Sequence, residues 1–147
     1  MNYDNALNQI KKILSKNPSN FLQKIVDFLC DNFEKYNWVG IYTVKRDNLI
    51  LGPWKGPKAT EHTRIPIGKG ICGAAAETGK TEIIKDVKED NRYLSCFLST
   101  KSEIVVPIRK NGIIIGEIDI DSDKKDAFTN QDKIFLEKIV DMLSEHI

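Results

Sequence analysis

The sequence of 147 residues has few side chains of the types that hold a structural metal. It contains three cysteines, Cys30, Cys72 and Cys96, and two histidines, His62 and His146. The cysteines form no CxxC pair, and these five residues cannot be arranged into a zinc-ligand spacing. We therefore expect neither a zinc-finger fold nor a metal in the functional site.

An excess of charge of one sign is also missing. The chain has 22 lysine and arginine residues against 21 aspartate and glutamate residues, a net charge of +1. This balance gives no electrostatic basis for binding a nucleic-acid backbone or an anionic membrane surface. No apolar run approaches the roughly 20 residues of a membrane span, and the N-terminal MNYDNALNQIKK lacks the apolar core of a secretory signal. We expect a cytoplasmic protein with reduced cysteines and without nucleic-acid or membrane partners.

The sequence also lacks internal repeats, low-complexity tracts and glycine–serine linkers. We therefore predict a single domain over residues 1–147. Residues 1–36 are expected to form N-terminal helices. Residues 37–147 are expected to form a sheet, a pocket segment and a C-terminal helix.

Apolar residues at helical spacing predict two helices before the sheet and one after it. The first helix ends at Asn17, because the residue before a proline is disfavoured in a helix. Ser19 or Asn20 can cap the second helix. The last helix begins at Thr129, which makes an imperfect capping box with Asp132 three residues on.

Between these helices the spacing changes to that of strands. WVGIYTV and NLILGPW predict one hairpin, and EIVVPIRK and IIIGEIDIDS predict another across Asn111-Gly112, a pair that favours a type I′ turn. Shorter strands are predicted at HTRIPI and TEII, on either side of a glycine-rich turn and a short helix. Repeated hairpins with flanking helices predict an α+β fold, an antiparallel sheet with helices packed on one face. The irregular segment 57–102 is left for the other face, where we expect a ligand pocket.

Acidic residues alternate with isoleucines at the end of the last predicted strand. The two-residue period of a strand places Glu117, Asp119 and Asp121 on one face, and Glu103 lies on the strand predicted to pair with it. One interpretation is a half-solvated sheet with its acids in water. The other is a buried cluster, because both strands are otherwise almost wholly apolar. At least one buried carboxyl would keep its proton near neutral pH, so the cluster could bind a small polar ligand or donate a proton to it.

Two cysteines and two aromatic residues allow a structural or a functional role. Cys96 lies in NRYLSCFLST, with apolar residues on both sides but no periodic place in a core. Cys72 follows a glycine-rich turn at a predicted helix start, where amide dipoles would favour a thiolate, although a small buried residue is the commoner case. Trp38 and Tyr42 alternate in the first hairpin and are more typical of a core than of a ligand site.

Six segments, taken in order, resemble a GAF domain. They are WVGIY, LGPWKG, RIPIGKGICGAAAETGK, CFLSTKSEIVVPI, GEIDIDS and FTNQD, within the span from Trp38 to Leu143. The combination of Cys96 with SEIVVP and DIDS is similar, more narrowly, to the free methionine-(R)-sulfoxide reductases, which are small single-domain GAF enzymes. The resemblance implies a GAF-like antiparallel sheet with helices on one face and a ligand pocket on the other. It also implies an enzyme that reduces free L-methionine (R)-S-oxide enclosed in that pocket, without a cofactor.

The resemblance also assigns roles to individual residues. Trp38 matches the aromatic residue that packs near the methyl group of the substrate, and Tyr42 is expected to line the same pocket. Cys72 matches a second family cysteine. The residues that match the catalytic cysteine and the carboxylates around the sulfoxide and the polar groups of the substrate are Cys96, Glu103, Asp119 and Asp121.

The recycling step is where this sequence departs from the family. Most members carry a third cysteine just before the RIP segment, which commonly forms a disulfide with the catalytic cysteine, but ATEHTRIP has Thr60, His62 and Thr63 there. In the implied reaction Cys96 attacks the sulfoxide sulfur, a carboxylic acid protonates the departing oxygen, and Cys96 becomes a sulfenic acid. Either Cys72 or an external thiol, from a small molecule or a thioredoxin-like protein, can resolve that sulfenic acid.

The leading hypothesis is a thiol-dependent, cytoplasmic free methionine-(R)-sulfoxide reductase. Its expected partners are free methionine sulfoxide and a thioredoxin-like or small-thiol reductant. Two alternatives stay open, a non-catalytic GAF module that binds a small ligand and signals through a partner, and a degenerate GAF domain that acts only in assembly. The assembly state is open too, with a homodimer as one candidate.

Overall fold

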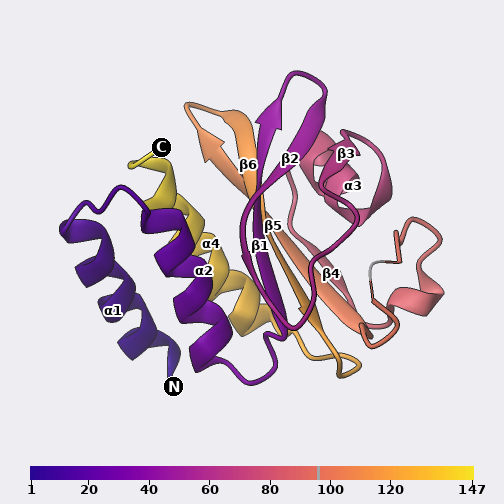
Figure 1. Ribbon diagram of the computed structural model, residues 1–147, viewed down its shortest axis with the longest axis horizontal. Helices are drawn as coiled ribbons and strands as arrows, with labels where there is room; N and C mark the ends of the chain where they lie inside the picture. Colours follow the sequence, from indigo (N-terminus) through magenta and orange to yellow (C-terminus); the bar gives the residue numbers. More distant parts are fainter. Residues whose placement is uncertain (96) are drawn as a thin grey trace.

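The computed structural model describes residues 1–95 and 97–147. Within these residues the strands form one six-stranded antiparallel sheet in the order β3-β2-β1-β6-β5-β4 (Figure 1). The strands are β1 (Trp38–Lys45), β2 (Asn48–Lys55), β3 (Arg64–Pro66), β4 (Glu82–Ile84), β5 (Ser102–Lys110) and β6 (Ile113–Ser122). The helices are α1 (Tyr3–Ser15), α2 (Phe21–Asn32), α3 (Gly70–Thr78) and α4 (Asn130–Ser144), with a short 3-10 helix η1 (Val87–Glu89). The predicted α+β fold with an antiparallel sheet is confirmed.

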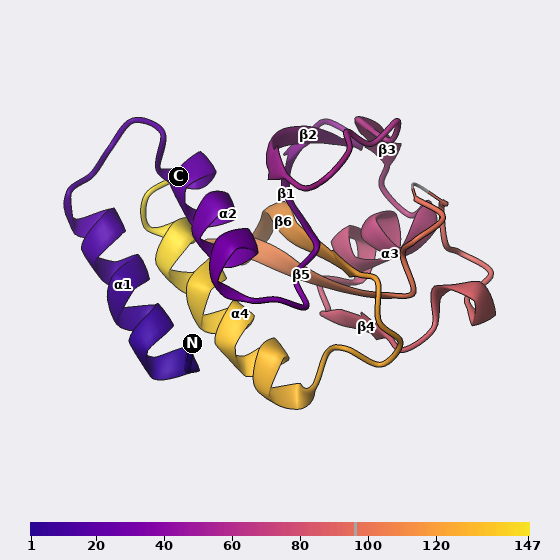
Figure 2. The same ribbon diagram turned by 60° about the horizontal axis from the view of Figure 1, so that its bottom comes forward.

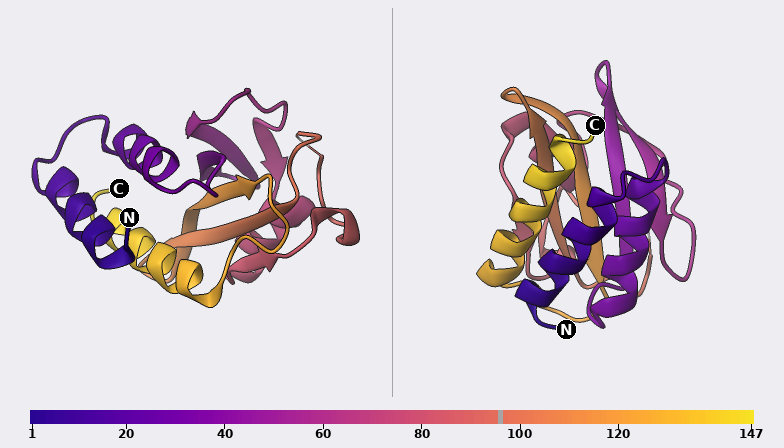
Figure 3. Two further views of the ribbon diagram at one scale, coloured as in Figure 1. Left: turned by 90° about the horizontal axis from the view of Figure 1, so that it is seen from below. Right: turned by 90° about the vertical axis from the view of Figure 1, so that its left-hand side faces the viewer.

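The two faces of the sheet are covered by different helices. α2 and α4 pack against one face, and α1 packs against both of them on their outer side (Figure 2). The side view in Figure 3 shows these three helices together in front of the sheet. α3 packs against β5 and β6 from the other face. None of the helices in the described part of the chain has the length and apolar composition needed to cross a membrane.

The sheet separates two apolar clusters, because alternate residues of each strand point to opposite faces. Val39, Ile118 and Ile120 belong to the larger cluster, which includes the buried faces of α1, α2 and α4. Tyr42 and Ile71 belong to the smaller cluster under α3. The strands in the middle of the sheet are therefore buried on both sides.

Three local signals in the sequence have the predicted effect. Asn111-Gly112 adopts φ angles of 54° and 78° between β5 and β6, as a type I′ turn requires. Gly79 ends α3 in the left-handed conformation. Thr129 and Asp132 form a complete capping box at the start of α4. At α2 the cap residue is Asn20, but its side chain makes no capping hydrogen bond.

The buried carboxylate of Asp132 joins α1, α4 and the segment before β1. Its Oδ1 accepts hydrogen bonds from the hydroxyls of Tyr3 (2.9 Å) and Tyr36 (2.6 Å). Its Oδ2 accepts hydrogen bonds from Lys35 Nζ (2.7 Å) and Thr129 N (2.8 Å). Burial alone would raise the pKa of Asp132, but these donors outweigh it and hold the pKa below its usual value. Asp132 is therefore charged at neutral pH.

We expect Asp132→Asn to lower the free energy of unfolding at pH 7 by about 2–4 kcal/mol. The asparagine amide would place an N–H donor against the groups that donate hydrogen bonds to Asp132. It would also remove the negative charge that pairs with Lys35. A carboxylate with a lowered folded pKa stabilises the protein above its unfolded pKa of about 3.9 and loses that contribution as the pH falls through the folded value. The effect should therefore shrink from about pH 4 downward, which urea unfolding between pH 7 and pH 3 measures.

Asp141→Asn, an exposed change in the same helix, is the matched control for this experiment. It should alter the free energy of unfolding by less than about 0.5 kcal/mol. An Asp132→Asn effect no larger than the control would contradict the anchoring role.

Candidate functional site

The four predicted carboxylates lie together on the face of the sheet that α3 covers, and we call them the acid row. Glu117, Asp119 and Asp121 alternate along β6, and Glu103 of β5 stands directly opposite Asp121 in the antiparallel register. All four side chains are buried, with exposed fractions between 0% and 5%. The interpretation of a half-solvated sheet with its acids in water is therefore wrong, because α3 covers this face.

Burial is the main cause that raises the pKa of every carboxyl in the acid row. The charge of Asp119 raises the pKa values of the other three members further. No ion pair in the described part of the chain includes a member of the row. Among the same residues, neither carboxylate oxygen of Glu117 has a hydrogen-bond partner. These carboxyl groups therefore keep their protons to a higher pH than they would in water, which is the direction predicted from the sequence.

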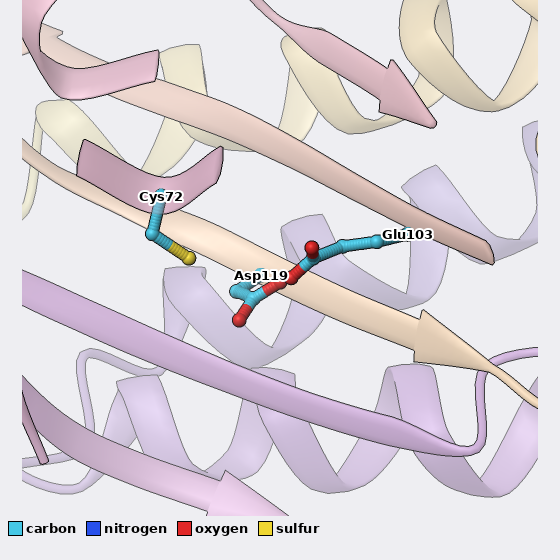
Figure 4. A group of neighbouring side chains, drawn as sticks. All are labelled: Cys72, Glu103 and Asp119. Atoms are coloured by element: carbon cyan, nitrogen blue, oxygen red, sulfur yellow. The ribbon is translucent and has the colours of Figure 1, made fainter. Parts of the chain in front are cut away.

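Cys72 faces the acid row from α3 (Figure 4). Its Sγ and one carboxylate oxygen each of Glu103 and Asp119 all lie within 4.8 Å of one another. Burial raises the pKa of the Cys72 thiol well above its usual value, and the neighbouring carboxylates raise it further. A thiolate favoured by the helix start is therefore the wrong interpretation. Desolvation and nearby negative charge outweigh the amide dipoles, so Cys72 is a buried thiol.

Trp38 and Tyr42 of β1 stand beside the acid row on the same face of the sheet. They pair in register with the last and the first members of the row on β6. Gly40 lies between them, opposite Asp119, and a Cβ atom at this position would lie 2.3 Å from Cη2 of Trp38. The indole ring therefore lies across Gly40, and it fits there only because glycine has no side chain. The alternation of residues along the strand does not predict this requirement, although a glycine inside a strand is its usual signal.

Two hollows adjoin the acid row, between the sheet and the segment 57–102, where the sequence predicts a pocket. The smaller hollow, of about 20 Å³, is lined by Tyr42, His62, Ile65, Ile71, Cys72, Leu94, Glu103 and Asp119. The larger hollow, of about 300 Å³, is lined by Asn37, Trp38, Pro57, Phe97, Ser99, Thr100, Asp121, Ser122 and Asp123. Its volume is at the lower end of the range for small-molecule sites.

Two polar contacts join the connections that border the smaller hollow. The hydroxyl of Tyr42 donates a hydrogen bond to the carbonyl oxygen of His62 (2.8 Å). Nε2 of His62 lies 3.3 Å from the carbonyl oxygen of Ser95. Sequence reasoning assigned His62 no role in the site. Cys96, the predicted catalytic residue, lies outside the described residues. Near it in the sequence, Leu94 lines the smaller hollow and Phe97 lines the larger one.

We expect Glu117→Gln to raise the free energy of unfolding at pH 8 by about 1 kcal/mol or more, because the amide avoids ionisation of a fully buried carboxyl. A carboxyl with a raised folded pKa carries no penalty below its unfolded pKa of about 4.3 and destabilises the fold as the pH rises toward the folded value. The gain should therefore vanish near pH 4. Urea unfolding at both pH values measures it, with the exposed change Glu61→Gln as the control. Equal effects of Glu117→Gln at both pH values would refute the raised pKa.

The chain is similar in sequence and in fold to proteins of one known family. The GAF domain family matches residues 17–147. Free methionine-R-sulfoxide reductase of Escherichia coli is 33% identical over 142 residues, which cover 95% of this chain and 85% of that protein. The free methionine-R-sulfoxide reductase from Neisseria meningitidis, solved in complex with its substrate, has a TM-score of 0.91 and 33% identity over 98% of this chain and 87% of that one.

A second solved structure, the type II free methionine-R-sulfoxide reductase from Thermoplasma acidophilum, has a TM-score of 0.82 and 39% identity, and covers 93% of both chains. The GAF-like fold implied by the sequence resemblance is confirmed. The chain belongs to the GAF domain family, within the group that includes the free methionine-R-sulfoxide reductases.

Proposed function

We propose that this protein, acting as one GAF domain over residues 1–147, reduces free methionine-(R)-sulfoxide to methionine. The observation that carries the proposal is the acid row, whose members are buried and have raised pKa values. One member, Asp121, lines the larger hollow, which has a suitable size for the substrate. A sulfoxide oxygen leaves only after it gains protons, and a carboxyl that stays protonated near neutral pH can supply one. The similarity to reductases over nearly the whole chain supports the same reaction.

In the proposed reaction the thiolate of Cys96 attacks the sulfur of the sulfoxide. A carboxylic acid of Glu103, Asp119 or Asp121 protonates the sulfoxide oxygen, and the sulfur–oxygen bond of the substrate breaks. The hydroxyl group passes to the sulfur of Cys96 and the sulfur–sulfur bond formed by the attack breaks. Cys96 is thereby oxidised by two electrons to a sulfenic acid, and the sulfoxide is reduced to methionine. The remaining members of the acid row are free to bind the polar groups of the amino acid, and Trp38 offers an apolar surface to its methyl group.

We infer that external thiols, from a small molecule or a thioredoxin-like protein, return Cys96 to the thiol. One thiol forms a mixed disulfide with Cys96 and releases water, and a second thiol reduces that disulfide. The attacking species in this step is a thiolate, and the pKa of the Cys72 thiol is raised by burial and by the acid row. Cys72 is therefore a weak nucleophile at neutral pH. An external thiol reacts without that penalty.

We expect Cys96→Ser to abolish the loss of free methionine-(R)-sulfoxide with dithiothreitol as the reductant, because the nucleophile is removed. Cys72→Ser should retain turnover with dithiothreitol and with thioredoxin, and Cys30→Ser is the control for a cysteine outside the site. Chromatography of the free amino acids measures the reaction. Turnover that survives Cys96→Ser would exclude Cys96 as the nucleophile. No turnover in the wild type would exclude the proposed enzyme and leave a non-catalytic ligand-binding module. Loss of thioredoxin-driven turnover alone in Cys72→Ser would make Cys72 the resolving thiol.

We expect Glu103→Gln or Asp119→Asn to lower turnover by roughly two to four orders of magnitude, as loss of a general acid does. The wild-type rate should fall as the pH rises through the raised pKa of the donor, because the deprotonated carboxylate cannot give a proton. Initial rates from pH 5 to pH 9 measure both effects, and Asp141→Asn, an exposed change in α4 on the other side of the sheet, is the matched control. Near-normal rates in both variants would refute a proton-donor role for Glu103 and Asp119.

A further inference from the structure

Three side chains that are distant in the sequence form a compact group of possible metal ligands. Cys72 comes from α3, Glu103 from β5 and Asp119 from β6. Their Sγ and carboxylate oxygen atoms lie within 4.8 Å of one another (Figure 4). Each side chain is buried, with an exposed fraction of 5% or 6%. The fold creates this group, and no ligand spacing along the chain reveals it.

The group offers ligand atoms that can become anionic, and no protein cation is bound to it within the described residues. Oδ1 of Asp119 is buried and has no hydrogen-bond partner among the described residues. Both carboxylate oxygens of Glu117, the neighbouring acid on β6, are likewise buried and have no hydrogen-bond partner among the described residues. The ion pairs in residues 1–95 and 97–147 all lie elsewhere. A cation entering this group would therefore gain at least one ligand, Oδ1 of Asp119, that no donor in the described structure holds.

The smaller hollow has the size for such a cation. Cys72, Glu103 and Asp119 all line it, and its volume is about 20 Å³. A space of roughly 10–15 Å³ holds one water molecule, so the hollow accepts a single ion or water but not an amino acid. The ligand atoms thus face a space that an ion can fill.

We propose that Cys72, Glu103 and Asp119 bind a divalent metal ion of the zinc class. One sulfur and two carboxylate oxygens are ligands that zinc accepts, and a thiolate ligand disfavours magnesium and calcium. Metal–ligand bonds of about 2.0–2.3 Å place the ligands of a tetrahedral site roughly 3.3–3.8 Å apart, so small side-chain rotations from the present positions close the site. Water supplies the fourth ligand. If the proposed reductase reaction is correct, the bound ion also blocks it, because it occupies two of the three candidate proton donors.

Binding of the ion displaces protons into solution. The Cys72 thiol gives up its proton as the sulfur–metal bond forms, and protonated carboxyls of Glu103 and Asp119 do the same. No oxidation or reduction takes place. The affinity should therefore increase with pH, over the range in which the raised pKa values of these groups keep them protonated in the free protein.

Cadmium is a suitable probe, because its bond to a thiolate gives an ultraviolet charge-transfer band. The test uses the full chain with Cys30→Ser and Cys96→Ser, which leaves Cys72 as the single cysteine and removes catalysis. We expect one equivalent of cadmium to produce the band, zinc to displace it and magnesium to leave it unchanged. Adding Asp119→Asn or Glu103→Gln should raise the dissociation constant for cadmium about tenfold or more. The exposed control Asp123→Asn should leave it unchanged. Urea unfolding confirms that each variant is folded.

Two results would overturn the proposal: no charge-transfer band in the folded single-cysteine protein, or a band whose dissociation constant is unchanged when Asp119→Asn and Glu103→Gln are combined. Both are read without turnover, so a failure of the proposed reductase function leaves the binding test intact. In the wild type, inhibition of turnover by zinc at the concentration that displaces cadmium would support the blocking effect. Undiminished turnover at saturating zinc would refute it.

Discussion

The packing of four carboxyl groups beside one another, away from water, is the constraint on which the rest of this molecule depends. A buried carboxylate without a paired cation costs several kcal/mol, and repulsion from its neighbours adds to the cost. The opposite face of the sheet offsets this, because isoleucines and valines of the same strands pack there against α2 and α4. The sheet therefore has a stabilising face and a chemically reactive face. Burial on the reactive face raises the pKa of the Cys72 thiol, of the candidate proton donors and of the candidate cation ligands.

The separation of the two faces depends on strand register. Ile118 and Ile120 lie between the acids of β6, so a slip of one residue would bring the carboxyls into the apolar cluster under α2 and α4. The Asn111-Gly112 turn and the register irregularity between Ile108 and Arg109 determine which residues of β5 and β6 meet. Glu103 stands opposite Asp121 as a consequence. The turn at the far end of the hairpin thus determines which side chains meet in the site.

Local rules predict the parts of this arrangement that lie within one hairpin. The period of two places the acids of β6 on one face, and the paired strand brings Glu103 to them, so the acid row is predictable from the sequence. What covers the row is not, because the approach of α3 depends on the course of a long irregular segment. For that reason the alternation of acids along β6 is by itself also compatible with carboxylates in water. The helix start at Cys72 by itself likewise indicates a thiolate. The space that Gly40 provides for Trp38 likewise depends on a side-chain direction that alternation does not determine.

Asp132 shows that burial alone does not determine how an acid behaves in this protein. It is as inaccessible as Glu117, yet its pKa is lowered while that of Glu117 is raised. The difference lies in the donors: hydroxyl, amide and ammonium groups surround Asp132, whereas the oxygens of Glu117 have no hydrogen-bond partner in the described structure. A satisfied carboxylate holds helices together and gains nothing from a ligand. An unsatisfied one is destabilising by itself, and a proton, a substrate or a cation that relieves it binds more tightly for that reason.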